Sequence, residues 1–479
     1  MFIRLRPDII YRNYGSFGYI TDNRNYEYKF LSDQHDDLGE MIVSESGMVF
    51  LEILDRRPKS LDQIVSELKN IFGEEDVESL RADASEFYIF LKQNGFLDIA
   101  PTFEECCHAK RVMSKSNVTI MNNNNINIQD YFTSVSDGKP QLTQLHMEVI
   151  SECNERCIHC YIPHEKKNTI MDIDQCLDIL DQAREMQVLN VTISGGEPLL
   201  HNDIIAILHR CYEYNFSVNL LSNLTMVNDE IVLAMKENPL LSVQTSLYAV
   251  EDVIHDGITK VKGSCEKTKA AIELLVNNGI PVQISCPIMK QNLYCYEEVI
   301  KWGREHDINV NSDYVIIGQY NHLLENLNCR LSIEDVSTVI QNDIRTDSNF
   351  WNKFVKQQEK RMKRSAGDPV CSVCFMSLCV APNGDIYPCA GWQGYKLGNI
   401  RETRLDELWN ESEKVTWLRG VHWSDFPKCM KCDDKDFCTM CLVRNANEDK
   451  DGNPLNVCGY FCQVAKLHKK LFMSKQGHI

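Results

Sequence analysis

Three cysteines in one short stretch carry the clearest chemical signal of this sequence. Cys153, Cys157 and Cys160 lie in CNERCIHCY, separated by three and then two residues. This spacing lets three thiolates of one loop point at a common centre, and thiolates select zinc, copper(I) or iron–sulfur clusters. A zinc ion needs a fourth ligand, which His159 or His164 can supply. The spacing alone therefore leaves a zinc loop and an iron–sulfur cluster open.

A second motif, SGGEP, covers Ser194 to Pro198. Its glycines let a ligand approach the backbone, and the Glu197 carboxylate can accept hydrogen bonds from a cationic amino group. Taken alone, the motif is better explained by a glycine turn that opens a helix.

The C-terminal quarter holds ten more cysteines, in CSVCFMSLCVAPNGDIYPC, in CMKCDDKDFCTMC and at Cys458 and Cys462. Paired Cys-x-x-Cys segments are typical of structural zinc sites, and two zinc sites would use eight thiolates. Two [4Fe–4S] clusters need the same number of ligands, so the spacing does not choose the metal.

The bulk composition limits where the chain works and what it binds. The 21 cysteines indicate metal binding in a reducing cytoplasm, because the N-terminus MFIRLRPDIIYRNYG lacks the features of a signal peptide. A formal net charge of −18 disfavours a nucleic acid held by phosphate contacts. No stretch of about 18 apolar residues predicts a membrane span.

Strand-like and helical segments alternate from Gln144 onward. The strands are expected in LHMEVI, NVTISG, SVNLLS, LSVQTS, PVQISCP and VNSDYVII. Such alternation predicts a parallel sheet of about six strands, consistent with a partial barrel. Chemistry in such barrels sits at the carboxyl ends of strands, where Cys153 and Gly195 follow the first and second strands.

Residues 1–100 predict a small α+β unit. FGYITD and YEYKFLS alternate like strands, and three helical segments include LDQIVSELKNIF and RADASEFYIFLKQNGFL, the latter closed by Gly95. This arrangement is winged-helix-like, although a plain capping domain fits as well. Residues 101–141, with Asn122 to Asn125 in a row, predict a linker.

The cysteine loop and SGGEP, each at a strand end, together resemble the radical S-adenosylmethionine (SAM) superfamily over Gln144 to Ile317. The resemblance implies an α/β fold with a partial (β/α)6 barrel, and a [4Fe–4S] cluster on Cys153, Cys157 and Cys160. SAM then fills the fourth position of that cluster, which leaves His159 and His164 as neighbours or surface residues.

The same resemblance implies which residues contact SAM. Some relatives hold its carboxylate with an Arg three residues after a His-Asp pair, whereas this chain has Thr259 there. Lys260 or Lys262 is the expected substitute. The expected SAM-binding residues are Tyr161, Gly195, Gly196, Glu197, Ser222, Asn223, Ser246 and Lys262, with Tyr248 beside them.

The C-terminal pattern resembles the SPASM domain, a twin-cluster extension of radical SAM enzymes. Cys374, Gly384 and Cys389 match its first signature, whereas the gap before Cys441 is two residues rather than three. The resemblance implies a first auxiliary [4Fe–4S] cluster on Cys371, Cys374, Cys389 and Cys441. It implies a second on Cys429, Cys432, Cys438 and Cys458, with Cys379 and Cys462 left over.

Residues 1–100 also resemble the PqqD-like recognition element that binds precursor peptides. LRPDIIYR, the two strands, SGMVFLEILDRRPKSLDQIVSEL and FLKQNGFL carry this likeness. A leader peptide would pair with a sheet edge and fill a groove beside a helix. The expected groove lies between a strand at Tyr26 to Phe30 and the helix at Phe87 to Lys92.

These resemblances imply a cytoplasmic maturase of ribosomally made peptides, with domains at 1–100, 142–317 and 369–479 and a helical bridge at 318–368. SAM would yield a 5′-deoxyadenosyl radical, with flavodoxin or ferredoxin as electron donor and neither nucleic acid nor membrane as partner. A thioether crosslink is the first expectation, carbon–carbon crosslinking the second, and epimerisation with Cys286, Cys295 or Cys329 as hydrogen donor the third. A sulfatase-type maturase and a zinc-stabilised peptide-binding scaffold remain as alternatives.

Overall fold

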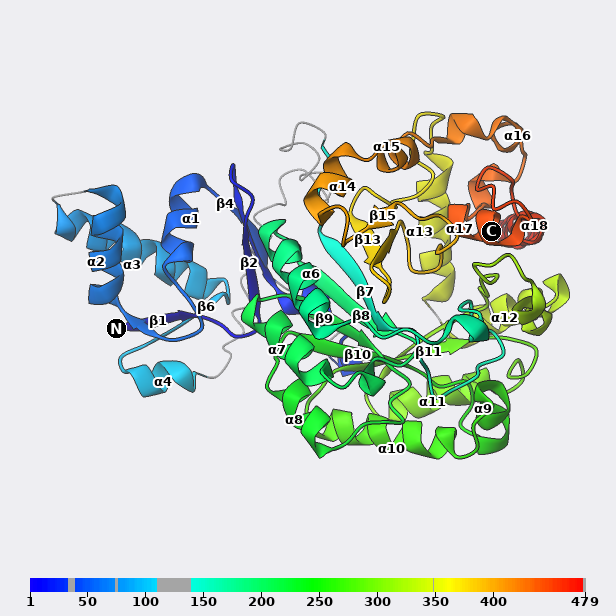
Figure 1. Cartoon of the computed structure of the whole chain (residues 1–479), viewed down its shortest axis with the longest axis horizontal. Helices are drawn as coiled ribbons and strands as arrows, with labels where there is room; N and C mark the ends of the chain where they lie inside the picture. Colours follow the sequence, from blue (N-terminus) through cyan, green and yellow to red (C-terminus); the bar gives the residue numbers. More distant parts are fainter. Residues whose placement is uncertain (33–38, 74–75, 110–138, 348, 477–479) are drawn as a thin grey trace.

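Six parallel strands that alternate with helices form the centre of the molecule, as the sequence predicts (Figure 1). This computed structural model describes residues 1–32, 39–73, 76–109, 139–347 and 349–476. The strands are β7 (Gln144–Ile150), β8 (Asn190–Gly195), β9 (Ser217–Leu221), β10 (Leu241–Ser246), β11 (Val282–Pro287) and β12 (Asn309–Asp313). They pair in chain order to form the partial barrel of the predicted α/β fold.

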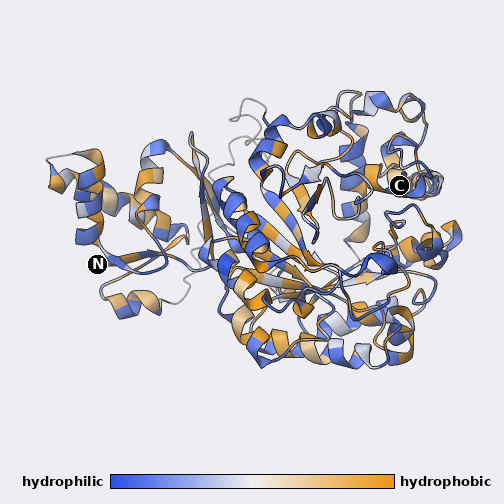
Figure 2. Cartoon of the chain, viewed as in Figure 1, coloured by the Kyte–Doolittle hydropathy of each residue, from blue (hydrophilic) through white to orange (hydrophobic). Residues whose placement is uncertain are grey.

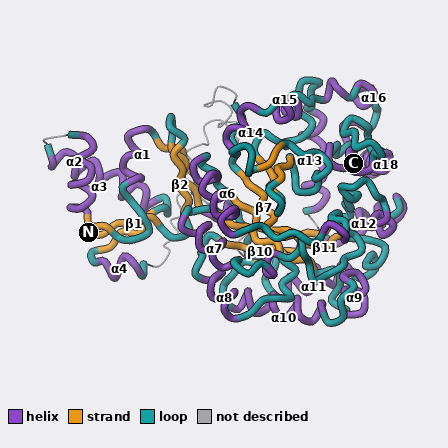
Figure 3. Tube along the Cα trace, in the orientation of Figure 1, coloured by secondary structure: helices purple, strands orange, loops and turns teal. Residues whose placement is uncertain are grey.

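Helices cover the outside of this sheet (Figure 3). They are α6 (Ile173–Glu185), α7 (Ile204–Glu213), α8 (Asp229–Lys236), α9 (Asp252–Thr259), α10 (Ser264–Asn277) and α11 (Tyr296–Glu305). Apolar and polar residues alternate along them, so that each helix has one apolar face for the sheet (Figure 2).

The two faces of the barrel strands differ in polarity. On β7, Leu145, Met147 and Val149 are buried in the main apolar core, whereas His146 and Glu148 point to the opposite, inner face. The other inner-face positions are mostly polar and half-buried, and include Thr192, Asn219, Gln244, Ser246, Gln283 and Ser285. The barrel therefore has a polar inner wall, which defines the candidate site.

C-terminal strands extend the same sheet beyond β7. β13 (Ser377–Val380) pairs in parallel with β7 and places Cys379 opposite His146. β14 (Asp385–Tyr387) and β15 (Gly398–Asn399) follow in antiparallel order. The remaining C-terminal helices are α12 (Ile333–Thr346), α13 (Phe350–Met362), α14 (Leu405–Glu411), α15 (Glu413–Arg419), α16 (Pro427–Met430), α17 (Leu442–Glu448) and α18 (Gly459–Gln476).

Two small sheets and three helices form the N-terminal unit. β1 (Phe2–Leu5) lies between β5 (Lys59–Ser60) and β6 (Leu97–Ala100), and β3 (Gly18–Asp22) lies between β2 (Ile9–Asn13) and β4 (Glu40–Val43). The helices are α1 (Glu45–Glu52), α2 (Leu61–Phe72) and α3 (Val77–Gln93). α3 ends just before Gly95, which has a positive φ as its predicted stop role requires.

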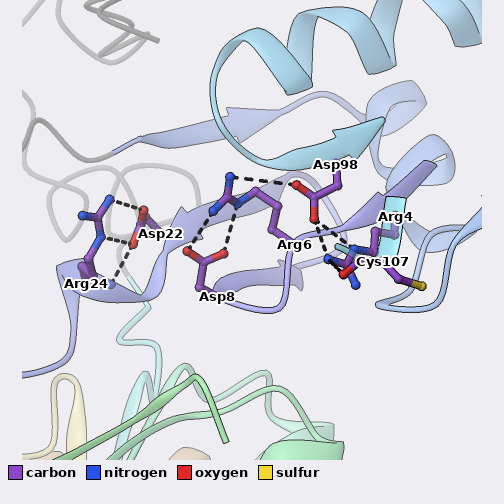
Figure 4. Close-up of polar contacts among 7 residues, drawn as sticks. All are labelled: Arg4, Arg6, Asp8, Asp22, Arg24, Asp98 and Cys107. Carbon is purple, nitrogen blue, oxygen red and sulfur yellow. Dashed lines mark hydrogen bonds and ion pairs between the residues drawn. The ribbon is translucent and has the colours of Figure 1, made fainter. Parts of the chain in front are cut away.

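Buried and half-buried ion pairs fix the strands of this unit (Figure 4). Arg4 on β1 pairs with Asp98 on β6 at 2.8 Å, and it also donates to the Cys107 carbonyl at 2.9 Å. Cys107 ends the short helix α4 (Phe103–Cys107), which lies in the predicted linker. Most of that linker, residues 110–138, falls outside the described residues.

The N-terminal unit docks on the amino end of the barrel. The buried Arg12 guanidinium donates to the carbonyls of Val188 and Asn215, both at 2.8 Å. Ile10, Phe17 and Tyr19 pack against Leu189 and Leu240, which precede β8 and β10. The unit therefore lies at the end of the barrel opposite to the cysteine loop.

The predicted strand at Tyr26 to Phe30 is wrong. The chain turns through a 3-10 helix at Asn23–Asn25 and then crosses the base of the barrel. There the Tyr28 N–H donates to the Ser242 hydroxyl at 3.0 Å, and Phe30 forms an isolated bridge with Ile308. Tyr26 packs between the N-terminal unit and the barrel, and its hydroxyl lies 2.9 Å from that of Tyr19 on β3, so the segment joins the two without forming a strand.

Within the part of the chain that the structure describes, none of the helices has the length and apolar character needed to span a membrane.

Candidate active site

The three loop cysteines follow β7 in a segment that folds back on itself. The Ser151 hydroxyl accepts from the N–H groups of Asn168 at 3.1 Å and Thr169 at 2.9 Å, and the Ser151 N–H donates to the Thr169 carbonyl at 2.8 Å. Two further backbone bonds, from Arg156 and Ile158, reach the carbonyls at the end of α9. The loop is thus held from both sides before any metal is considered.

The thiols of Cys153, Cys157 and Cys160 are half-buried and act on one another electrostatically. Burial raises the pKa of Cys153 to about 11, and it raises the pKa of Cys157 well above its usual value, with the Glu155 carboxylate adding to the rise. Such thiols become thiolates only when a cation compensates them, as a bound metal does. The donor set therefore fits a metal cluster.

The SGGEP turn lies directly against the backbone that leads into the cysteine loop. The Gly196 N–H donates to the Ile150 carbonyl at 2.7 Å, and the Glu197 N–H donates to the Glu152 carbonyl at 2.9 Å. A Cβ on Gly196 would lie 2.1 Å from the Glu152 oxygen, and one on Gly195 would lie 1.9 Å from the Ile150 oxygen. Only glycine fits at these positions, as expected for a turn that cradles a ligand.

Glu197 joins the ends of β8 and β9. Its carboxylate accepts from the Ser222 hydroxyl and the Asn223 N–H, both at 2.7 Å, and from the Leu199 N–H at 2.9 Å. Burial raises its pKa to about 7. Since one oxygen accepts two of these bonds and the other only one, the carboxylate keeps room for a cationic donor.

The structure brings most predicted SAM-binding residues to this edge of the sheet. The Asn223 side chain donates to Asn154, the residue after Cys153, at 2.7 Å. Ser246 ends β10 and is hydrogen bonded to Tyr248. Gly195, Gly196, Glu197, Ser222 and Asn223 therefore surround the loop, with Ser246 on the next strand.

Tyr248 connects β10 to the cysteine loop. Its hydroxyl lies 3.4 Å from His159 Nε2 and 4.0 Å from Cys157 Sγ. Burial lowers the pKa of His159 to about 4, so the imidazole is neutral. His164 lies exposed in a 3-10 turn.

Two of the residues predicted to bind SAM lie away from this edge of the sheet. Lys262 is exposed in the turn between α9 and α10. Tyr161 points along the inner wall and donates to Glu148 at 3.2 Å. Instead, the charge of Lys167 acts on both Cys153 and His159. The sequence did not predict this lysine, because only the turn held by Ser151 brings it back to the loop.

The first set of C-terminal cysteines lies beside β13 and β14. Burial raises the pKa of Cys389, and the charges of Cys441 and Cys371 raise it further. Cys374 is buried and is affected in the same way by Cys371. These are the four cysteines predicted for the first auxiliary cluster, and the structure brings them into electrostatic contact.

In the second set, Cys462 rather than Cys458 is in electrostatic contact with Cys429 and Cys438. Burial and the charges of Cys462 and Cys429 raise the pKa of Cys438, and Cys462 and Cys432 have the same effect on Cys429. The Cys458 thiol instead donates to the Glu448 carboxylate at 3.1 Å. Cys462 lies within α18, one helical turn after Cys458, the residue that the resemblance to the SPASM domain implies as a ligand.

One compact group of possible ligand atoms lies outside the predicted cysteine sets. Two thiolates on one zinc ion are at most about 4.6 Å apart, twice the Zn–S bond length. Among the described residues, three ligand atoms within 4.8 Å of one another occur at His146, Glu148 and Cys379, and not within any predicted cysteine set.

Comparison with known families identifies two segments of the chain. Residues 147–303 match the model of the Radical SAM superfamily, and residues 371–433 match SPASM, an iron–sulfur cluster-binding domain. The first segment contains the cysteine loop and SGGEP. The second contains the C-terminal cysteines from Cys371 to Cys432.

Curated relatives are about one quarter identical to this chain. The antilisterial bacteriocin subtilosin biosynthesis protein AlbA of Bacillus subtilis (strain 168) is 24% identical over 334 residues, which cover 68% of this chain and 73% of AlbA. The PqqA peptide cyclase of Gluconobacter oxydans (strain 621H) is 24% identical over 303 residues, covering 60% and 82% respectively.

One solved structure shares the fold over nearly the whole chain. Streptococcus suis SuiB, bound to its precursor peptide SuiA, superimposes with a TM-score of 0.60 at 16% identity. The match covers 96% of this chain and 100% of SuiB.

Proposed function

We propose that this chain, a radical SAM enzyme with an SPASM domain, matures a ribosomally made precursor peptide by closing a crosslink within it. The chain binds S-adenosyl-L-methionine and iron–sulfur clusters through these domains. The observation that carries the proposal is the polar inner wall of the barrel, which lies between the loop cysteines and the C-terminal cysteines. The names of AlbA and PqqA peptide cyclase, and the peptide bound to SuiB, support a peptide as substrate.

When bound at the cysteine loop, SAM supplies the radical that removes a hydrogen atom from the substrate. The chain's own residues would orient it: Gly195 and Gly196 allow close approach, and Glu197 accepts from its amino group. Lys167 is proposed as the partner of its carboxylate, in place of Lys260 or Lys262. Tyr248 and His159 shield the loop from water on the β10 side.

We propose two auxiliary [4Fe–4S] clusters in the C-terminal domain. The first would use Cys371, Cys374, Cys389 and Cys441, and the second would use Cys429, Cys432, Cys438 and Cys462. These clusters would accept the electron that the substrate loses when its new bond closes. A zinc-stabilised scaffold is less well supported, because residues 147–303 match the Radical SAM superfamily and residues 371–433 match an iron–sulfur cluster-binding domain.

The N-terminal unit is proposed to bind the leader segment of the precursor. Since Tyr26 to Phe30 contacts the barrel, the proposed edge is β4, which pairs only with β3 among the described residues. The end of α3 lies beside it: a Cβ on Gly39, next to β4, would lie 3.1 Å from the Asn94 carbonyl. On α3, Ile89 and Phe90 are 46% and 37% exposed, which offers apolar surface to a bound strand.

A thioether between a core cysteine and a carbon of the acceptor residue is the proposed product, and a carbon–carbon crosslink is the second candidate. Epimerisation is less well supported. Of its expected hydrogen donors, Cys286 is buried in the main core, and the thiols of Cys295 and Cys329 donate to backbone carbonyls.

The proposal is tested by anaerobic purification and co-expression. The protein should carry about twelve irons, three [4Fe–4S] clusters, and should absorb near 400 nm. The enzyme is co-expressed in the cytoplasm with a short open reading frame found beside its gene, with flavodoxin or ferredoxin as electron donor. The encoded peptide should lose two hydrogen atoms. A colourless zinc protein that leaves the peptide unchanged would refute the proposal.

A further inference from the structure

Three titratable side chains meet on the inner wall of the barrel, outside both C-terminal cysteine sets. His146 and Glu148 alternate on β7, and Cys379 lies opposite His146 on β13. One ligand-type atom from each lies within 4.8 Å of the other two. The parallel pairing of β13 with β7 creates this group, so it exists only where the C-terminal domain extends the barrel.

Hydrogen bonds hold the Glu148 carboxylate in one orientation. The Tyr161 hydroxyl donates to one oxygen at 3.2 Å, and the Gln393 amide donates to the other at 2.6 Å. These donors come from the cysteine loop and from the segment after β14. Each oxygen retains a free lone pair, so the carboxylate can still accept a proton.

Glu148 is buried without a compensating cation. It is 1% exposed, and within the described ranges no Lys or Arg forms an ion pair with it. Burial raises its pKa to about 7, opposed by the bonds from Gln393 and Tyr161. A carboxyl group of this kind exchanges its proton near neutral pH, which is the range that suits a general base.

The groups that face Glu148 do not titrate in the same range. Burial lowers the pKa of His146 to about 4, and burial together with the Glu148 charge raises the pKa values of Cys379 and Tyr161 well above their usual values. The Glu148 charge also acts on Tyr320 and Cys389, and burial is the main reason that the pKa values of these two groups are raised. Near pH 7, Glu148 is therefore the member of this group that changes charge.

The location of Glu148 matches the path of the proposed reaction. Its hydrogen-bond partner Tyr161 directly follows Cys160 in the loop that would hold SAM. Its charge also acts on Cys389, in the first C-terminal set. The carboxylate therefore lies between the group that would remove a hydrogen atom and the group that would accept an electron.

We propose that Glu148 is the proton acceptor of the bond-forming step, with Tyr161 and Gln393 as its positioning residues. This inference rests on the proposed function. In that reaction, a substrate X–H bond and a C–H bond break, and one X–C bond forms. One hydrogen atom leaves with the radical supplied by SAM, one electron passes to an iron–sulfur cluster of the C-terminal domain, and one proton passes to Glu148, so atoms and charge balance.

The test compares crosslinking with SAM cleavage in Glu148→Gln, using the cluster-loaded full-length enzyme, SAM and the precursor peptide. We expect the yield of 5′-deoxyadenosine to stay within about threefold of wild type, while crosslinked peptide falls by about 100-fold or more, the usual size of a general-base contribution. Glu334→Gln makes the same chemical change on the exposed surface of α12 and should alter neither yield. Equal crosslinking per 5′-deoxyadenosine in Glu148→Gln and wild type would overturn the inference.

A second measurement needs no variant, in case Glu148→Gln loses iron. Since only ionised Glu148 accepts a proton, the wild-type ratio of crosslink to 5′-deoxyadenosine should rise as the pH increases through about 7 and fall below it. A ratio that stays constant from about pH 6 to about pH 8.5 would overturn the inference. So would one stoichiometric zinc ion that Glu148→Gln releases, because the group would then be a metal site. A wild-type enzyme that cleaves SAM but leaves the peptide unmodified would instead refute the proposed function.

Discussion

At the scale of single residues, Gly196 has little freedom to change. A Cβ at this position would meet two carbonyl oxygens of the cysteine loop, at 2.1 Å from Glu152 and 2.4 Å from Ser151. Both contacts are with backbone, so relief would require the SGGEP turn and the loop to separate. Since the turn is proposed to hold SAM, the effect should appear first in SAM binding.

Gly196→Ala is expected to weaken SAM binding to the cluster-loaded enzyme by roughly 5- to 150-fold, the equivalent of about 1–3 kcal/mol of overpacking. Equilibrium titration with SAM measures the change. Gly367→Ala is the matched control, because a Cβ there meets no atom within 4 Å. Unchanged affinity in Gly196→Ala would mean that the turn does not contact SAM.

The two cysteines near the start of α18 differ in their surroundings. Cys462 acts electrostatically on Cys429 and Cys438, whereas Cys458 donates to Glu448, which also pairs with Arg330 at 2.6 Å. Cys462→Ser should therefore lose about four irons per chain, one [4Fe–4S] cluster, while Cys458→Ser should keep them. Iron analysis of the two variants decides between them, and the reverse result would support Cys458, the ligand that the resemblance to the SPASM domain implies.

At the scale of elements, the contact between the N-terminal unit and the barrel depends on Arg12. Its guanidinium is fully buried against carbonyls, and burial lowers its pKa to about 9. Hydrogen bonds from a charged donor contribute about 1.5–3 kcal/mol each, and their loss leaves buried carbonyls unpaired.

Arg12→Leu should destabilise the docked state by about 2–4 kcal/mol. Hydrogen exchange in β2 and β3 should accelerate, whereas exchange in the barrel strands β9 and β10 should change little. Arg345→Leu, on the exposed surface of α12, provides the comparison. Equal protection of β2 and β3 in wild type and Arg12→Leu would show that Arg12 does not hold the unit on the barrel.

The cysteine loop is an element without regular structure, and Ser151 defines its shape. Ser151→Ala removes an acceptor for the N–H groups of Asn168 and Thr169, next to Lys167. We expect SAM affinity to fall by roughly 5- to 10-fold, about 1 kcal/mol, with iron content unchanged, because the thiols keep their other contacts. Loss of the cluster itself would contradict this role, and Ser337→Ala on α12 is the control.

At the scale of the whole molecule, periodicity predicted the barrel but not how its parts meet. The six strands follow from alternating strand and helix segments, each with its own local pattern. The same reasoning failed at Tyr26 to Phe30, because the backbone of this segment pairs with Ser242 and Ile308 of the barrel rather than with a strand of the N-terminal unit.

The site was predictable where a motif is local and unpredictable where distant segments converge. The loop cysteines and SGGEP are local motifs. Lys167 reaches the loop only through a turn. Cys462 lies one helical turn from Cys458, so two neighbouring cysteines compete for one role. Glu148 meets Cys379 across more than 200 residues of chain. No sequence signal fixes such distances, since they depend on strand pairing and helix placement.

The central claim is that the polar interior of the barrel is where a peptide is modified by radical chemistry. The most direct measurement is mass spectrometry of the precursor peptide after anaerobic reaction with the cluster-loaded enzyme, SAM and a reductant, alongside the yield of 5′-deoxyadenosine. The account predicts loss of two hydrogen atoms from the peptide, dependent on SAM and abolished by Cys157→Ala. An unmodified peptide despite SAM cleavage, or modification that persists in Cys157→Ala, would contradict it.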